Sequence, residues 1–310
     1  MIFLPEQLQE LLNVISYHHL FVASTTLGVD VLSEEDKELL RLHGVDIDDL
    51  NHDIPVADRM YHFGKLAGIL RMDQALLLGY NDFLKFIKLG QYIPLNAREK
   101  FELDIAKRKT YTYLKGLNER ARGDLESSIL SESSVRKLYE DTVQEGLVAG
   151  VADRKSVGKI ISDLGHKIEE WRHDWGRIVE TEMNNIFQIG KAATFFEKDG
   201  IETLVWKQVY EGACRHCIEK YLTAGLGSKP RVFKLSDLAK NLTNVGRKVA
   251  EWVATLGSLH PYCRCDLRRL PPKYVWNEEI KRFELPKIIK DRIERKSKVK
   301  ITVGDKVFLV

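Results

Sequence analysis

Hydrophobic positions in this 310-residue chain recur mainly in steps of three and four through the first 200 residues. Such spacing places apolar side chains on one side of an α-helix, so it predicts a largely helical first part of the chain. Residues 1–95 show the pattern in short runs separated by polar turns, and the most regular run covers 56–78. Residues 1–130 are therefore expected to form a helical N-terminal region.

Two further helices are predicted from residues that suit helix ends. Asn96 followed by Glu99 has the form of a capping box, which opens a charged helix extending to about Arg122. Another helix is expected to begin after Ser134 and to end at Gly150.

The longest periodic stripe lies between Asp153 and Phe196. It predicts one long helix, which dominates the segment 131–200 and packs against the helices before it. Its apolar members are Val157, Ile160, Leu164, Ile168, Trp171, Trp175, Ile178, Ile186, Ile189, Ala193 and Phe196.

The pattern changes after Gly200. Residues 203–210 are rich in β-branched and aromatic side chains and predict a strand, and 265–270 predict a second strand that Pro271 ends. Between them, residues 235–256 have the spacing of an amphipathic helix. Residues 201–272 are therefore expected to form a small cysteine-rich α+β module.

The last segment, 273–310, is a basic tail. Two strand-like runs, 298–303 and 306–310, flank Gly304 and Asp305, a pair typical of β-hairpin turns. An isolated hairpin is marginal in water, so this one is expected to dock on its own domain or on a neighbour. The chain is thus predicted to be α+β, with a mainly α-helical N-terminal body, a small zinc-knuckle β module and a C-terminal hairpin tail.

Composition narrows the class of protein only a little. Charged residues make up 30% and hydrophobic residues 44% of the chain, as in ordinary soluble globular proteins. A net charge of +3 gives no general case for a protein that coats nucleic acid. The first residues lack the features of a secretory signal, and no apolar run approaches the roughly 18–20 residues needed to cross a bilayer. We therefore expect no membrane association and folding in a cytosol, where thiols stay reduced.

All four cysteines lie in two tight clusters, Cys214-Arg-His-Cys217 and His260-Pro-Tyr-Cys263-Arg-Cys265. Two cysteines three positions apart can hold one metal ion, and a second turn of this kind completes a tetrahedron. The pattern predicts a structural zinc site.

The spacing leaves the ligand set of this site open. The first choice is Cys214, Cys217, Cys263 and Cys265, and the second replaces Cys263 with His260. His216 is expected to point outward. Two disulfides formed after release from the cell, or four unligated thiols, are the alternatives to a metal. A thioredoxin-like redox site is not expected, because Cys214 is not predicted to open a helix within a βαβ unit.

Four thiolates around one dication leave about two surplus negative charges. Four arginines lie within a few positions of the cysteines and are expected to offset this charge through contacts with the ligands. They are Arg215, Arg264, Arg268 and Arg269.

Catalytic motifs are not found in the sequence. It contains no His-Glu-x-x-His, no Gly-x-Ser-x-Gly and no nucleotide-binding loop, and the Gly-rich run 225–229 has the composition of a linker. We therefore predict that the protein is not an enzyme. A zinc-ribbon protein that binds nucleic acid through its arginines remains the alternative function.

Residues 178–271 resemble the phage head morphogenesis family typified by the F protein of phage Mu. The resemblance rests on an ordered series: a helix bearing Glu180-Thr-Glu182, a strand bearing a tryptophan, Cys-x-x-Cys, an insert, and His-Pro-x-Cys-Arg-Cys. Its matching residues are Glu182, Asn185, Gly190, Trp206, Cys214, Cys217, His260, Pro261, Cys263, Arg264 and Cys265. Glu180 stands where the family usually has arginine.

The resemblance implies a minor structural protein of a tailed-phage head, present in multiple copies. Such a protein is expected to act in head assembly near the portal and inner shell, with the portal protein or the major capsid protein as partner. The packaged DNA is a further possible partner. The resemblance also implies location in the virion head, after a period in the host cytoplasm during assembly.

Overall fold

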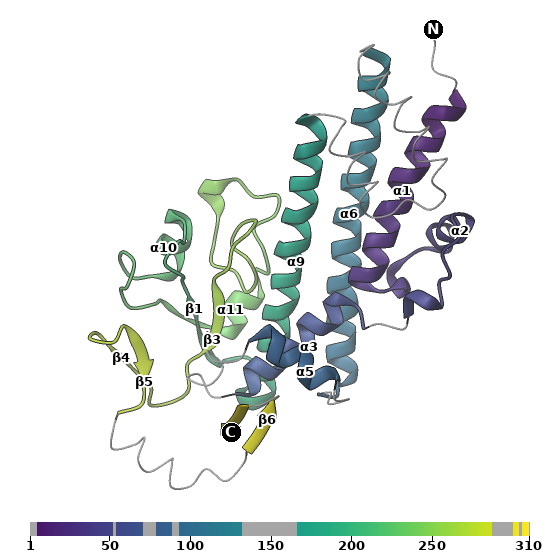
Figure 1. Cartoon of the computed structure of the whole chain (residues 1–310). Coiled ribbons are helices and arrows are strands. Elements are labelled where there is room, and N and C mark those ends of the chain that lie inside the picture. Colours follow the sequence, from purple (N-terminus) through teal and green to yellow (C-terminus); the bar gives the residue numbers. More distant parts are fainter. Residues whose placement is uncertain are drawn as a thin grey trace. The chain divides into compact units, whose positions relative to one another are not determined.

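The computed structural model describes residues 5–51, 54–70, 79–88, 93–131, 166–286, 300–303 and 306–309. It is a mixed α+β structure, mostly helical with small antiparallel sheets, as the sequence predicts (Figure 1). The chain divides into two compact units: Met1–Asp58 with Asp104–Glu180, and Arg59–Leu103 with Thr181–Val310. Within the described ranges, no helix combines the length and the apolar character needed to cross a membrane.

The first unit is helical. Its elements are α1 (Pro5–Leu27), η1 (Val29–Val31), α2 (Glu34–Leu42), η2 (Asp49–Asn51) and parts of α6 (Ala97–Ser131) and α9 (His166–Asp199). Lys107 of α6 is buried and lies 3.1 Å from Asp30 and 3.2 Å from Asp58. A buried cation must be paired, so these two carboxylates fix α6 against the segment that follows α1. The helix predicted over 134–150 lies outside the described residues.

The capping box that opens α6 is confirmed. The backbone N–H of Asn96 donates to Glu99 Oε2, and the N–H of Glu99 donates to Asn96 Oδ1, both at 2.9 Å. The helix runs to Ser131, beyond the expected end near Arg122. Glu99 is buried and also accepts a 2.6 Å hydrogen bond from Lys65, which pairs the carboxylate inside the second unit.

The long helix predicted from the apolar stripe is present as α9, which continues without interruption through Gly176. The predicted part before His166 lies outside the described residues. Gly200 follows the last residue of α9. Its φ of 77° is left-handed, and its N–H donates a 2.8 Å hydrogen bond to Phe196 O. Glycine tolerates this backbone conformation and is the usual residue at such a helix end.

Helix α3 (Val56–Ile69) crosses α9 at glycines within the second unit. A methyl group on Gly64 would overlap the carbonyl oxygen of Phe187, and one on Gly190 would overlap that of Tyr61. Thr194 donates a 3.2 Å hydrogen bond to Lys65 O at the same crossing. The two helices therefore approach so closely that only glycine fits at either position.

A three-stranded antiparallel sheet follows α9 in the second unit. Its strands are β1 (Leu204–Gln208), β2 (Val232–Lys234) and β3 (Asp266–Arg269), in the order β2-β1-β3. Both predicted strands are confirmed, and β2 is a third strand that the sequence did not predict. Val205 and Leu267 are fully buried in a hydrophobic core with Ala192 and Phe195 of α9. Figure 1 shows β1, β3 and α11 (Leu235–Ala239) beside the green end of α9.

The prediction of an amphipathic helix over 235–256 is wrong. Only α11 and a turn of 3₁₀ helix, η3 (Val249–Glu251), are helical there. Asn244 accepts a hydrogen bond from Val253 N–H and donates to the carbonyl oxygens of Val253 and Leu259. Leu256 N–H also donates to Asn241 O. The Asn244 side chain thus satisfies backbone groups that a helix would have paired, and the segment folds back on itself.

Two small hairpins complete the second unit. β4 (Val275–Asn277) pairs antiparallel with β5 (Arg282–Glu284), a hairpin that the sequence did not predict. β6 (Lys300–Val303) pairs antiparallel with β7 (Lys306–Leu309), and β6 contacts α5 (Tyr80–Lys88).

Replacing Gly190 with alanine should destabilise the protein by about 1–3 kcal/mol, because the added methyl group has no space between α9 and α3. Gly116→Ala is the matched control, since Gly116 lies in a helix with no atom within 4 Å of the added group. This control should stabilise the protein by about 0.5–1 kcal/mol. Urea unfolding followed by circular dichroism measures both changes. A Gly190→Ala protein as stable as the unchanged chain would contradict the close helix crossing.

Candidate metal centre

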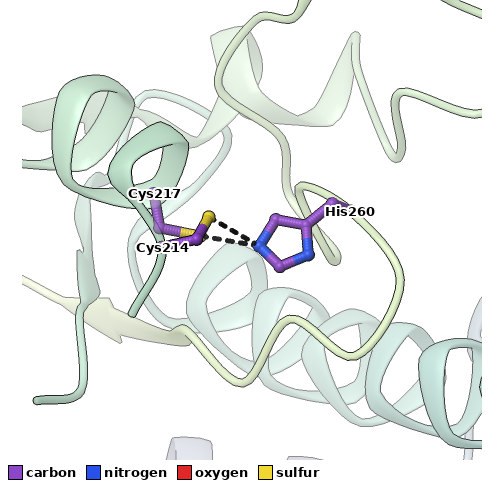
Figure 2. Close-up of side chains that lie close together, drawn as sticks. All are labelled: Cys214, Cys217 and His260. Carbon is purple, nitrogen blue, oxygen red and sulfur yellow. Dashed lines mark hydrogen bonds between the residues drawn. The ribbon is translucent and has the colours of Figure 1, made fainter. Parts of the chain in front are cut away.

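Five side chains that can bind a metal converge in the second unit: Cys214, Cys217, His260, Cys263 and Cys265, called here the Cys–His cluster. Cys214 is the N-cap of α10 (Arg215–Tyr221), and Cys217 lies in the first turn of this helix. The other three come from the loop that leads into β3. Figure 2 shows His260 reaching from this loop toward the two sulfurs at the start of α10.

The five residues form two groups that share Cys217. In the first, His260 Nε2 lies 3.1 Å from Cys214 Sγ and 3.2 Å from Cys217 Sγ. In the second, Cys217, Cys263 and Cys265 are all buried, and their Sγ atoms lie within 4.8 Å of one another. Ligand atoms around a tetrahedral zinc lie about 3.5–3.8 Å apart, given Zn–S and Zn–N distances of about 2.3 and 2.0 Å. The cluster is therefore close to the size that a metal requires.

Disulfide bonds do not join these cysteines. All four are free, and the Cys217 and Cys263 sulfurs are 3.6 Å apart, against about 2.05 Å in a disulfide.

His260 is oriented as a metal ligand. Its Nδ1–H donates a 2.6 Å hydrogen bond to the carbonyl oxygen of Pro261, which leaves Nε2 with a free lone pair facing the sulfurs. A ligand histidine usually donates its other ring N–H in this way. The Trp252 ring stacks on His260 at 6.1 Å between centroids, and His216 packs edge-on against Trp252 at 5.2 Å. His216 thus supports the tryptophan and belongs to neither group of candidate ligands.

Hydrogen bonds within the cluster favour a thiolate at Cys263. The Cys217 and Cys265 thiols and the backbone N–H groups of Cys265 and Leu259 donate to its sulfur, and they hold the pKa of Cys263 far below its usual range. The Cys217 thiol donates hydrogen bonds to the sulfurs of Cys263 and Cys265, and these bonds raise the pKa of Cys217. A thiolate is the form of cysteine that binds a metal, so this arrangement of donors suits Cys263 as a ligand.

A fully buried lysine provides the positive charge nearest this cluster. Lys207 of β1 donates hydrogen bonds to the carbonyl oxygens of Leu256 and Gly257. Burial lowers the pKa of Lys207 to about 8, and negative charge on Cys263 acts in the opposite direction. The charged lysine is therefore favoured by the thiolates beside it.

The four arginines do not have the role expected from the sequence. Arg268 pairs with Asp266 at 2.6 Å, and Arg269 pairs with Asp199. Arg215 and Arg264 are exposed. Two of the four are thus paired with carboxylates, and the buried cation beside the sulfurs is a lysine that the spacing did not indicate.

A polar face of α9 holds the loop that carries His260, Cys263 and Cys265. Asn184 donates hydrogen bonds to Ser258 Oγ at 2.9 Å and to Cys263 O at 3.0 Å. Asn185 accepts from Ser258 N–H at 2.7 Å. These side chains replace the backbone pairing that a regular element would have given the loop.

The same face continues along α9 on both sides of the asparagines. Thr181 accepts from Tyr262 N–H at 3.1 Å, and Gln188 accepts from Leu267 N–H at 2.8 Å. Lys191 is almost completely buried and pairs with Asp266 at 2.6 Å. Burial lowers the pKa of Lys191 to about 7, while Asp266 acts in the opposite direction. Five polar residues at helical spacing therefore position the loop from Ser258 to Leu267.

Cys214 is the N-cap of α10, the first helix after β1. The sheet around β1 is antiparallel, however, so the strand and helix are not part of a βαβ unit. The structural context of a thioredoxin-like redox motif is absent from this described sheet.

The spacing of the cysteines and His260 indicates the side chains that can bind a metal, but not the groups that support them. Lys207 and Trp252 lie seven and eight residues before Cys214 and His260, yet no motif marks either of them as a neighbour of the cluster. The one available signal was the run of Asn184, Asn185 and Gln188 inside an apolar helical stripe, because polar residues on a buried face need partners.

The chain matches no protein-family model, no curated protein and no solved structure.

Replacing Asn184 with alanine should weaken metal binding about 10- to 100-fold, because the loop loses one hydrogen bond to the Ser258 hydroxyl and one to the Cys263 backbone. Competition with a chromophoric chelator measures the affinity. Glu180→Ala is the matched control, since Glu180 is exposed on the same helix one turn earlier. Equal affinities for the two variants would show that α9 does not position the ligands.

Proposed function

We propose that the Cys–His cluster binds one structural Zn²⁺ through Cys214, Cys217, His260 and Cys263. The orientation of His260 supports this set, because its free nitrogen faces two sulfurs. Cys263 is the fourth ligand because its sulfur is the favoured thiolate and lies 3.6 Å from Cys217. Nitrogen and sulfur ligands suit zinc rather than magnesium or calcium, and two of the four, Cys217 and Cys263, are buried.

The charge of the surroundings supports three thiolates and one histidine. Three thiolates and one dication leave a charge of about −1, whereas four thiolates would leave about −2. The fully buried Lys207 supplies one positive charge. The charge of about −1 on a site that includes His260 is therefore offset by the positive charge of Lys207.

The zinc would have a structural role. It joins the start of α10 to the loop before β3 and closes the irregular segment between them. Metal-coupled folding of this kind is worth roughly 10–16 kcal/mol in small zinc domains. That is enough to order a segment held mainly by side-chain hydrogen bonds.

Native mass spectrometry with elemental analysis should find one zinc per chain. Cys263→Ser should abolish this stoichiometric zinc, because it removes a ligand. Cys265→Ser is the matched control, since Cys265 is equally buried and two residues away but is not in the proposed set; it should retain the zinc. If Cys265→Ser loses the zinc and Cys263→Ser retains it, Cys265 is the fourth ligand in place of Cys263. If both variants retain the zinc, the proposed site is contradicted.

For the whole protein, we propose a minor structural role in the head of a tailed phage. The observation that carries the proposal is the ordered series from Asn185 to Cys265, which the fold assembles into one module. The series includes a tryptophan on β1, Cys-x-x-Cys at the start of α10 and His-Pro-x-Cys-Arg-Cys leading into β3. In this role the module is an assembly interface near the portal and inner shell.

The C-terminal hairpin suits such an interface. β6 and β7 form a sheet of only two strands, and an unpaired strand edge can pair with a strand of another protein. We propose that this hairpin adds strands to the portal or to the major capsid protein.

Deleting residues 298–310 should abolish incorporation of the protein into phage heads while zinc content and circular dichroism stay unchanged. The matched control replaces Lys298, Lys300 and Lys306 with glutamine, which removes positive charge and keeps the strands. Quantitative mass spectrometry of purified heads measures copy number. A normal copy number for the deletion variant would contradict docking through the hairpin.

The exposed Arg215 and Arg264, each adjacent to a proposed zinc ligand, favour a second candidate. In that case the protein is a zinc-ribbon protein that binds the packaged DNA. Tight DNA binding that weakens steeply with salt would favour it, and negligible retention on DNA at about 50 mM salt would exclude it.

A further inference from the structure

The second unit contains a cavity of about 220 Å³ on the face of the sheet opposite α9. Side chains alternate along β1, so Val205 and Lys207 face the core and the metal site, while Trp206 and Gln208 face the cavity. The β4–β5 hairpin covers this face through Phe283, whose ring lies 5.2 Å from that of Trp206. The cavity therefore lies between a sheet and a hairpin of the same unit and is open on one side.

Aromatic rings make up much of the cavity wall. Trp206, Tyr274, Trp276 and Phe283 all line it. Phe283 also packs edge-on against Trp276 at 5.3 Å, so the rings support one another. Flat aromatic walls favour a flat aromatic ligand, which can stack on them.

Polar groups lie at the base of the cavity. Arg268 of β3 is only 9% exposed, and its Nε–H donates a 3.1 Å hydrogen bond to Gln208 Oε1. Asp266 pairs with the same guanidinium group. Asp266 and Gln208 hold the guanidinium in place, so its remaining N–H groups are fixed as donors for a ligand that carries ring nitrogen or carbonyl acceptors.

The cavity lining also carries charged side chains, namely two cations and the carboxylate of Glu284, which accepts a hydrogen bond from Asn277. Lys281 and Arg282 both line it and are exposed, and Lys281 pairs with Glu278 at 3.0 Å. No ion pair involves Arg282 within the described part of the chain. An anionic group at the mouth of the cavity would therefore meet an available guanidinium.

Lys281 also has an unusual backbone conformation. Its φ is 50°, in the left-handed region where glycine is the favoured residue. A lysine at this turn costs stability relative to glycine, and strained residues of this kind concentrate at binding sites. The hairpin thus keeps a cation at the cavity mouth where glycine would suit the backbone better.

We propose that this cavity binds a nucleotide, with the base among the aromatic rings and the phosphate beside Lys281 and Arg282. An engineered apolar cavity of about 150 Å³ accepts benzene, so 220 Å³ holds one heterocyclic base. A nucleotide has the features that this cavity would bind: a flat ring, hydrogen-bond acceptors at the edge of the ring and a negative charge. Its source is either a free nucleotide or one residue of a single strand.

Isothermal titration calorimetry of the zinc-loaded full chain tests the proposal. The probes are adenosine 5′-monophosphate, its two halves adenosine and ribose 5-phosphate, and a ten-residue thymidine oligonucleotide. The monophosphate should bind at least tenfold tighter than either half. An oligonucleotide that binds tenfold tighter than the monophosphate identifies a strand as the source, and similar affinities identify a free nucleotide.

Lys281→Gly separates a binding role from a structural one. It should weaken nucleotide binding about fivefold or more while the melting temperature stays equal or rises, because glycine relieves the left-handed backbone. Arg282→Glu should weaken binding at least tenfold. Lys240→Glu is the matched control, since it makes the same charge change at an exposed site outside the cavity; its affinity should stay within twofold.

Three results would overturn the proposal. In the first, neither the monophosphate nor the oligonucleotide binds at millimolar concentration. In the second, Lys281→Gly and Arg282→Glu bind the nucleotide as tightly as the unchanged chain. In the third, Lys240→Glu loses as much nucleotide affinity as Arg282→Glu. Binding of an acidic aromatic peptide in place of every nucleotide probe would also overturn it and identify a protein partner. None of these results depends on whether the protein enters phage heads.

Discussion

Negative charge on buried sulfur is the constraint on which the second unit depends. Thiolates can leave water only where a cation stays beside them, and Lys207 meets this need from the middle of β1. Its ammonium group also donates to the carbonyl oxygens of Leu256 and Gly257, so the residue that balances charge also fixes the chain beside the cluster. Lys207 therefore connects β1 with the Cys–His cluster and with the irregular segment that contains Leu256 and Gly257.

The loop that carries the metal-binding residues has almost no regular structure of its own. Its backbone is ordered by the polar face of α9 and by Asn244, which bond to it at several points. A helix gives these side chains a rigid base, and a metal can then close a site that is already nearly formed. The close crossing of α3 and α9 at Gly64 and Gly190 anchors the same helix on its other side.

The sheet gives its two faces different roles. One face carries Val205 and Lys207 toward the hydrophobic core and the cluster, and the other carries Trp206 and Gln208 toward the aromatic cavity. Val209 contacts the hydrophobic residues around the cluster and also lines the cavity. Because one short strand contributes to both, order at the Cys–His cluster supports the shape of the cavity.

The sequence by itself determined the features that depend on local pattern. The capping box of Asn96 and Glu99, the long apolar stripe of α9, the strands around Trp206 and Leu267, and the clustering of four cysteines all follow from residue types at fixed spacing. The helix expected over 235–256 failed because Asn244 bonds to Val253 and Leu259, residues whose proximity no local pattern reveals.

Only the tertiary structure decided how the site is supported. It placed His260 Nε2 against two sulfurs, brought Lys207 beside them and folded the β4–β5 hairpin over Trp206. These contacts join residues far apart in sequence, and their energies depend on burial and charge in three dimensions. Spacing identifies which atoms can bind a metal, whereas the balance of buried charge that selects among them exists only in the folded chain.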